Sequence, residues 1–406
     1  MNIRSITYFL NPNQPSRAEA LGKAESFLAA SRPAFESAGF PVQTARLATV
    51  PFAQLNPNWV PAQAVGTAQE LERAAQAAGY DYISLGPAVP AAPGSFEVIP
   101  EILAGTESVF LSGRMASGGE GISLPAVRAC AEIIQQAAVI SPNGFANLRF
   151  AALANVASGS PFFPAAYHEG EQPRFALATE AAGLAVEAIA GAASLLEARH
   201  RLVEAVEAQA AELARVGAEL EKQFEVDFGG IDFSLAPFPE AARSLGTALE
   251  GLGVPEVGLH GSLAAAAFVA DALDRARFPR VGFSGLMLPV MEDSVLAARA
   301  AEGQLGVNDL LLYSAVCGTG LDTVPLPGDV TVGQLQAILL DLAALAQRLE
   351  KPLTARLMPI PGKAAGEDTG FDFAYFANSR VLAVRAEPLG GLLAGDETWQ
   401  LRSRKV

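Results

Sequence analysis

The chain has 406 residues, half of them hydrophobic, and carries a formal net charge of −15. A chain of this length can bury a large core in one domain or in two. Its negative charge repels nucleic-acid phosphates and anionic lipid surfaces, so we expect no nucleic-acid or membrane partner, although a local basic pocket could still hold a small anion.

The N-terminus and the cysteines narrow the class of protein further. The first residues, MNIRSITYFLNPNQP, lack a basic stretch followed by a long apolar core, and no later run reaches about 18 apolar residues, so we expect a cytoplasmic protein. Cys130 and Cys317 are the only cysteines, too few for a disulfide framework or a cysteine-based zinc site.

The first third of the chain alternates between two kinds of segment. β-branched and aromatic residues favour strands over residues 2–10, 41–50, 81–86 and 107–113. Between them, apolar residues recur at three-to-four spacing after a serine or threonine, which predicts helices over residues 16–39, 67–79 and 123–140.

The middle of the chain has a different composition. Residues 175–224 form an alanine-rich stretch with glutamate and arginine at helical spacing and no proline. We expect two long helices here, bent near Gly191. They either form a layer that covers the sheet or bury one face in a homodimer, because alanine-rich faces let helices approach closely.

The later part of the chain returns to the alternation of strands and helices. Strands are expected over residues 280–288, 308–318, 352–360 and 380–386, and helices over 262–276 and 331–349. Thr331 and Gln334 resemble a capping box at the start of the last helix. Strands that alternate with helices predict a parallel sheet with helices packed outside it. Since no linker divides the chain, we expect one α/β domain over residues 1–406.

Polar residues interrupt two of the later apolar stretches. Asp232 and Ser234 are two residues apart, so they point to the same side of a strand, either into a ligand site or towards solvent. Ser284 is a further candidate ligand contact. Beyond Pro289, Glu292 and Asp293 either belong to a site or charge the start of a helix.

His260 is a candidate proton carrier. It precedes Gly261 and Ser262 at the start of the helix expected over residues 262–276. A helix N-terminus lowers the pKa of an imidazole, which suits a neutral histidine that acts as a base. The alternative is an ordinary loop histidine.

The stretch YSAVCGTGLDTVPLPGD, residues 313–329, combines a thiol, glycines and carboxylates. We expect Gly318 and Gly320 to let the backbone approach a ligand, with Cys317 and Asp322 as catalytic groups on the pocket floor. Cys317 is alternatively an inert buried thiol. A divalent cation would fit if four carboxylates converged, those of Glu292, Asp293, Asp322 and Asp329.

Two cations accompany the strand expected over residues 352–360. Arg356 lies within this strand, and Lys363 follows it after a Pro-Gly turn. Cations near the carboxyl end of a strand would bind an acid or phosphate group, because α/β folds place ligands there. The alternative is a salt-bridged arginine and a solvated lysine.

Several ordered blocks resemble the uncharacterised family called domain of unknown function 711. The blocks are RFAALANVASGSPFFPAAYH (149–168), FSLAPFP (233–239), LHGSLAAAA, GFSGLMLPVMED, AVCGTGLDTVPLPGD and ARLMPIPGK. The first strand, NIRSIT, also resembles the start of that family. The resemblance covers most of the chain beyond residue 149.

The resemblance implies a fold similar to the ten-stranded α/β barrel of glycyl radical enzymes such as pyruvate formate-lyase, and a homodimer. Those enzymes store the radical on a glycine in an RVxG loop. The most similar segment in this sequence is RVLAV, residues 380–384, which has Ala383 at the position of that glycine. We therefore expect no radical chemistry.

Two classes of function remain open. In the first, a cytosolic enzyme uses acid/base chemistry on a small anionic metabolite, with His260, Cys317 and Asp322 near the reacting atoms and Arg356 and Lys363 on the anion. In the second, the chain is a metabolite-binding regulatory protein. The resemblance implies a small ACT-domain protein as its partner.

Overall fold

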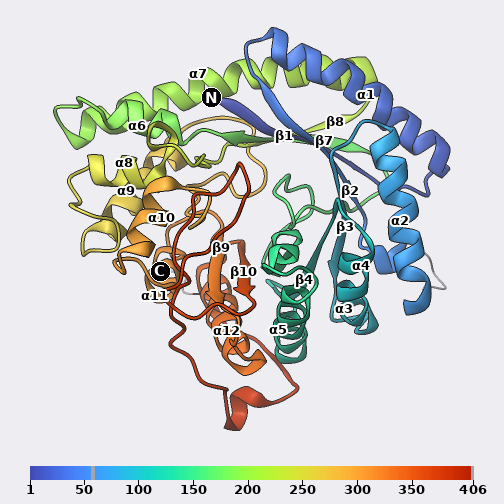
Figure 1. Cartoon of the computed structure of the whole chain (residues 1–406). Coiled ribbons are helices and arrows are strands. Elements are labelled where there is room, and N and C mark those ends of the chain that lie inside the picture. Colours follow the sequence, from blue (N-terminus) through green and yellow to red (C-terminus); the bar gives the residue numbers. More distant parts are fainter. Residues whose placement is uncertain (56–59, 404–406) are drawn as a thin grey trace.

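The computed structural model describes residues 1–55 and 60–403. A large, strongly curved sheet runs through it, and helices cover its outer side (Figure 1). Its strands are β1 (Asn2–Leu10), β2 (Val42–Thr49), β3 (Tyr82–Ala88), β4 (Val109–Ser117), β5 (Gly121–Ser123), β6 (Phe150–Ala154), β7 (Arg174–Glu180), β8 (Asp227–Asp232), β9 (Gly320–Pro327), β10 (Leu353–Ile360) and β11 (Thr398–Trp399).

The sheet is mostly parallel. Its strands lie in the order β8-β7-β1-β2-β3-β4-β6-β10-β9, and only the β7/β1 and β6/β10 neighbours on this path are antiparallel. The short strands β5 and β11 pair beside β4. The expected α/β class is thus confirmed, and every strand belongs to one sheet.

The sheet is not closed, so the expected ten-stranded barrel is not confirmed. The path ends at β8 and β9, and the segment expected as a strand over residues 280–288 contributes only isolated bridges to Ile231 and Leu235. Positive φ angles at Gly282 (+67°) and Ser284 (+40°) interrupt the extended backbone there. Residues with these angles depart from extended backbone and interrupt the regular hydrogen bonding of a strand.

Three of the expected helices outside the sheet begin directly after the serine or threonine that the sequence suggested as their first residue. Ser16, Ser123 and Thr331 each accept a backbone N–H of the following turn, and Thr331 forms the expected capping box with Gln334. The helices are α1 (Arg17–Ser37), α2 (Pro61–Ala77), α3 (Gly94–Glu97), α4 (Ile99–Gly105), α5 (Leu124–Ala138), α6 (Ala182–Ile189), α7 (Leu195–Phe224), α8 (Leu245–Gly251), α9 (Ser262–Arg275), α10 (Ser294–Ala301), α11 (Val307–Tyr313) and α12 (Val332–Leu349).

The alanine-rich middle segment is only partly as expected. Its first residues form strand β7, which pairs with β1, so the prediction of helix there was wrong. The break near Gly191 is confirmed, since α6 ends at Ile189 and α7 begins at Leu195. Gly191 has a φ of +69°, which glycine adopts without the cost that a Cβ atom would bring.

Two predicted strands near the C-terminal end are absent from the described residues. Residues 308–313 belong to helix α11, where Asp309 accepts the N–H of Gly306 at 2.9 Å. Residues 380–386 form one isolated bridge and separate backbone hydrogen bonds, which include one from Leu382 N to Pro325 O. Pro325 and Pro327 of β9 have no N–H to donate towards residues 380–386, which disfavours a continuous ladder on that side of β9.

Alternation along the strands separates an outer apolar face from an inner polar one. On β2, Ala45 and Leu47 pack in the core beneath the helices, whereas Thr44 and Arg46 lie on the inner side and line a cavity. Within the described residues, no helix is both long and apolar enough to cross a membrane.

His168 is a buried histidine whose ring has no hydrogen-bond partner among the described residues. It is 1% exposed, and burial together with the charge of Arg174 lowers its pKa to about 4. The unfolded chain therefore takes up this proton more readily than the folded chain. The associated stability is fully present above the unfolded pKa of 6.5 and is lost as the pH falls towards 4.

We expect about 3 kcal/mol of unfolding free energy to disappear over this pH window because of His168. His168→Phe should flatten that part of the pH dependence, measured by urea unfolding at several pH values. His200→Asn, at an exposed histidine, should leave it unchanged. Equal pH slopes in wild type and His168→Phe would contradict the prediction.

Candidate functional site

The inner side of the sheet encloses a cavity with one polar wall and one apolar wall. Its volume is about 90 Å³, and a single water molecule needs about 10–15 Å³ on the same measure. The cavity therefore suits a small molecule. The charged residues that line it are Arg4, Arg46, Glu292, Asp322 and Arg356, and the apolar wall includes Phe110, Leu148, Phe162, Phe163 and Met287.

Strand geometry explains why Arg4 belongs to this wall. The register between β1 and β7 shifts between Ile3 and Ser5, which marks a β-bulge. Ile3 packs in the core beneath the helices, whereas Arg4 lines the cavity. Bulges commonly redirect side chains next to functional sites.

Arg356 joins two buried carboxylates. Its Nε donates to Asp322 Oδ1 at 2.6 Å and one of its terminal nitrogens donates to Glu292 Oε1 at 2.8 Å. Side-chain exposures of 7%, 2% and 7% for Arg356, Asp322 and Glu292 keep this cluster almost out of solvent. Arg4 forms a second ion pair with Glu292.

The two carboxylates differ in acidity. Burial, and next the charge of Glu292, raise the pKa of Asp322 above its ordinary value, against the opposing effect of Arg356. Burial alone would also raise the pKa of Glu292, but the charges of Arg4 and Arg356 hold it below its ordinary value. Of the two, Asp322 is therefore the group that takes up a proton first, and pKa values separated in this way identify acid/base pairs.

Arg46 is the cation of the cavity that has no acidic partner among the described residues. Its Nε donates to Thr44 Oγ1 at 2.9 Å, and its guanidinium lies 5.1 Å from the ring centre of Phe163 and 6.0 Å from that of Tyr82. Burial and the nearby charge of Arg4 lower its pKa to about 9. A guanidinium held this way can receive an anion.

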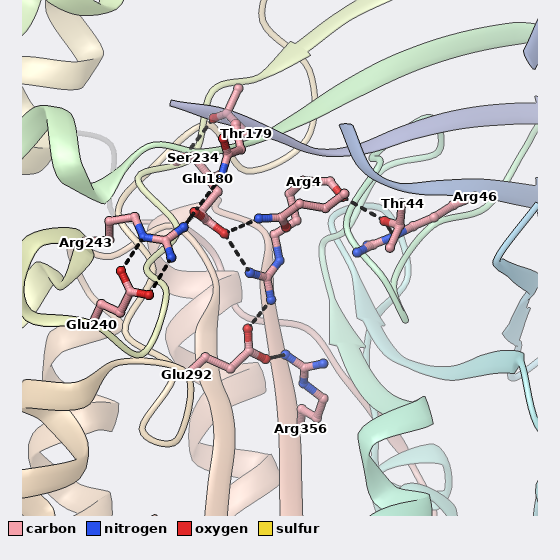
Figure 2. A network of polar contacts seen from close by, with 12 residues as sticks. Arg4, Thr44, Arg46, Thr179, Glu180, Ser234, Glu240, Arg243, Glu292 and Arg356 are labelled. Carbon is pink, nitrogen blue, oxygen red and sulfur yellow. Dashed lines mark hydrogen bonds and ion pairs between the residues drawn. The ribbon is translucent and has the colours of Figure 1, made fainter. Parts of the chain in front are cut away.

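A further ion-pair chain lies at the edge of the cavity. Glu180 accepts from Arg243 at 2.7 Å and lies 3.9 Å from Arg4. Figure 2 shows these contacts running from Glu240 through Arg243, Glu180 and Arg4 to Glu292, whereas Arg46 contacts only Thr44 in the same view. The ring of Tyr375, in the loop after β10, lies over the guanidinium of Arg4, with 5.8 Å between the ring centre and Arg4 Cζ.

The structure brings three of the predicted site residues to the cavity. Ser234, Asp322 and Arg356 line it. Asp232 instead binds a distant backbone segment, accepting the N–H groups of Phe283 at 3.0 Å and Ser284 at 2.8 Å. The Ser284 hydroxyl donates to Ile231 O at 3.1 Å, so Asp232 and Ser284 stabilise the backbone around the site.

Other predicted residues lie away from the cavity lining. His260 is exposed in the loop before α9, and Lys363 is half-buried in the turn after β10. Cys317 is buried, and its Sγ accepts the N–H of Gly320 at 3.3 Å. His260, Cys317 and Asp322 therefore do not surround one pocket.

The glycines beside Cys317 serve close contacts between backbones. A Cβ on Gly318 would lie 2.9 Å from the Cα of Gly285. A Cβ on Gly320, whose φ is +102°, would lie 2.4 Å from the carbonyl oxygen of Thr354 on the paired strand. Packing between strands explains these glycines without a ligand.

Gly320→Val should destabilise the fold by about 2–5 kcal/mol, because backbone strain and overpacking add. Gly366→Val is the matched control, since Gly366 also has a positive φ (+88°) but no atom near its Cβ position. We expect the control to show the smaller loss of unfolding free energy in urea denaturation. Equal losses in the two variants would mean that the Thr354 contact is unimportant.

The four carboxylates considered for a cation do not converge. Glu292 and Asp322 both bind Arg356, whereas Asp329 is exposed. Asp293 caps helix α10 and accepts the N–H of Leu245 at 2.7 Å, so it forms part of two helix starts. No group of three or more potential metal-ligating side chains occurs in residues 1–55 and 60–403.

The sequence analysis missed Arg4, Arg46 and Glu180. A signal was present for Arg46, since it occupies the same face as Thr44 in an otherwise apolar strand, and a charged residue there needs a special environment. Arg4 gave no such signal, because its orientation depends on the bulge.

Comparison with known proteins identifies relatives over nearly the whole chain. A family model described as "Uncharacterised ACR (DUF711)" matches residues 1–398. A UPF0210 protein of Pyrobaculum arsenaticum is 35% identical over 395 residues, covering 90% of this chain and 87% of the relative. A UPF0210 protein of Neisseria gonorrhoeae is 29% identical over 376 residues, covering 89% and 83%. The resemblance read from the ordered blocks is confirmed, and the chain belongs to the uncharacterised DUF711 family.

Proposed function

We propose that this protein is an enzyme that binds a small anionic metabolite in the cavity and moves a proton on it through Asp322. One observation carries the proposal: a guanidinium without an acidic partner, that of Arg46, shares a small cavity with a buried carboxyl group of raised pKa. Perturbed titratable groups in a cleft are typical of catalytic sites.

The cluster gives each side chain a separate task. Arg46 holds the anionic group of the ligand, and Asp322 donates or accepts the proton. Arg356 orients Asp322 through the 2.6 Å hydrogen bond and balances its charge in the ionised form. Glu292 stays ionised between Arg4 and Arg356 and keeps both guanidinium groups in place.

The residue at the position of the radical glycine also favours polar chemistry over radical chemistry. We propose a curved sheet related to the barrel of glycyl radical enzymes, but Ala383 occupies the position of their radical glycine. Ala383 is exposed, whereas a stored radical requires protection from solvent. This supports an acid/base reaction in the cavity.

A non-catalytic role is the second candidate. It is favoured by the scatter of the three predicted catalytic residues, since His260 and Cys317 do not line the cavity that contains Asp322. In this role the protein binds a metabolite and passes the signal to a small ACT-domain partner. The binding site would be the same, and Arg46 would still hold the anion.

Two variants distinguish the candidates. Purified protein is incubated with a cell-derived small-metabolite extract, and mass spectrometry records which compounds are retained and which are consumed. An enzyme should lose turnover in Asp322→Asn while still retaining its ligand, and Arg46→Gln should lose both. Retention that is equal in wild type and Arg46→Gln would contradict the proposed site.

The assembly belongs to the same proposal. We propose a cytoplasmic homodimer in which the first turn of α7 contributes to the interface, because Leu195 and Leu196 are 58% and 72% exposed there. The rest of the apolar face of α7, including Leu202 and Leu213, is buried in its own chain. Light scattering at micromolar concentration measures the mass, and a monomer would contradict this proposal.

A further inference from the structure

We propose that the cavity selects a small monocarboxylate with a short apolar chain, in preference to dicarboxylates and inorganic phosphate. The inference rests on the proposed function, because it concerns the ligand of the same site. It goes further by specifying the number of charges and the shape of that ligand.

The number of charges follows from the guanidinium groups. Arg4 and Arg356 are each already paired with a carboxylate of the protein. Among residues 1–55 and 60–403, Arg46 has only its Nε bond to Thr44, which leaves the two terminal nitrogens for a ligand. One guanidinium fork matches one carboxylate in a bidentate pair.

A second negative charge on the ligand would meet an unfavourable environment. The carboxylates of Glu292 and Asp322 line the cavity, and both are held by Arg356. A second ligand carboxylate would therefore face like charges or the aromatic wall. Burying a charge without a partner is strongly unfavourable.

The apolar wall determines the remainder of the ligand. Phe110 contacts both Tyr82 and Phe163, with ring centres 5.1 Å and 5.4 Å apart, and Phe162 packs on Phe283 at 5.2 Å. These contacts fix the rings, so they form a preorganised apolar surface next to the anion anchor. An alkyl chain that extends from a carboxylate on Arg46 would lie against this surface.

The cavity volume limits the length of that chain. A volume of about 90 Å³ corresponds to about six to nine water-sized positions at 10–15 Å³ each. The carboxylate takes about three of them, which leaves room for about three to six carbon atoms. Butyrate, pentanoate, hexanoate and heptanoate match this size.

The test is calorimetric titration of the full chain with acetate, butyrate, hexanoate, octanoate, succinate and inorganic phosphate. Binding should tighten about fourfold for each buried methylene up to hexanoate. It should not tighten further for octanoate. Succinate and phosphate should bind at least tenfold more weakly than butyrate.

Variants locate the binding site. Arg46→Gln should weaken butyrate binding about 10- to 100-fold, since a hydrogen-bonded charge pair is lost. Arg215→Gln, at an exposed arginine on α7, should leave binding unchanged. Phe110→Ala, or Leu148→Ala if that variant does not fold, should shift the preference towards octanoate because both residues line the apolar wall.

The outcomes separate this inference from the proposed function. Tighter binding of succinate or phosphate than butyrate, lost in Arg46→Gln, overturns the monocarboxylate inference and leaves the anion site standing. Failure of all six compounds to bind also overturns the monocarboxylate inference, and the proposed function then depends on whether Arg46→Gln loses the ligand that wild type retains from the metabolite extract. Butyrate binding that Arg46→Gln does not change overturns both.

Discussion

Replacing Arg356 with methionine is expected to lower the free energy of unfolding by about 3–5 kcal/mol near neutral pH. The change leaves the carboxylates of Asp322 and Glu292 buried at 2% and 7% exposure without their shared partner. Methionine fills a similar volume, so the loss comes from unpaired charge and not from an empty space. Urea denaturation at pH 7 measures it.

The pH dependence of this variant identifies the cause. Without the Arg356 charge, the pKa values of both carboxyl groups should rise above their unfolded values. A raised carboxyl pKa gives stability that is present below the unfolded pKa and lost as the pH rises through the folded one. The deficit of Arg356→Met should therefore shrink below about pH 4.

A compensating change provides the control for Arg356→Met. Adding Asp322→Asn removes the buried carboxylate that has lost Arg356, whereas Glu292 keeps its ion pair with Arg4. The double variant should therefore recover part of the lost stability at pH 7. A deficit below about 1 kcal/mol for Arg356→Met would contradict a desolvated cluster, because that is the usual range for exposed ion pairs.

Replacing Asp322 with asparagine is expected to reduce turnover by about 10²- to 10⁴-fold, the usual contribution of a general acid or base. Asparagine has nearly the same shape but carries no transferable proton. Since burial disfavours the ionised form of Asp322, the neutral amide should cost less than about 1 kcal/mol of stability. Turnover of metabolites and urea unfolding are measured on the same preparations.

Asp329→Asn is the matched control for Asp322→Asn. Asp329 lies seven residues further along the chain and is exposed, so turnover should stay at the wild-type level. If Asp322→Asn keeps full turnover, Asp322 does not carry the proton. If neither variant nor wild type consumes a metabolite that the protein retains, the binding role is the better description.

Local sequence signals predicted the parts of the fold that depend on local interactions. The capping box of Thr331 and Gln334 and the break at Gly191 depend on side chains and dihedral angles within a few residues. The first four strands were found because their β-branched residues are buried between layers. Their ends shifted by only a few residues.

Interactions over long sequence distances account for the errors. Strand β7, RFALATE, contains one β-branched residue, Thr179, and it pairs with β1, which lies more than 160 residues away in the chain. The error at residues 308–313, NDLLLY, has a local cause instead: leucine favours helices, and Asp309 accepts the N–H of Gly306 at the helix start. Local propensity cannot detect a neighbouring strand.

The candidate site was predicted only in part, because some of its features depend on contacts between distant parts of the chain. Asp322 was recognised as a carboxylate in the glycine-rich stretch 313–329, and Arg356 as a cation near the carboxyl end of an expected strand. Whether Arg46 has an acidic partner depends on Arg4 and Glu292, which come from distant parts of the chain. Cys317 and its glycines suggested a pocket floor, but their small size serves contacts with Gly285 and Thr354.

A crystal structure of the protein with bound butyrate tests the central claim most directly. The account predicts butyrate in the cavity, with its carboxylate oxygens about 2.7–2.9 Å from the terminal nitrogens of Arg46. Its alkyl chain should lie against Phe110 and Phe162. Butyrate bound elsewhere, or an Arg46 guanidinium that turns away to pair with a protein carboxylate while the cavity holds no anion, would contradict the account.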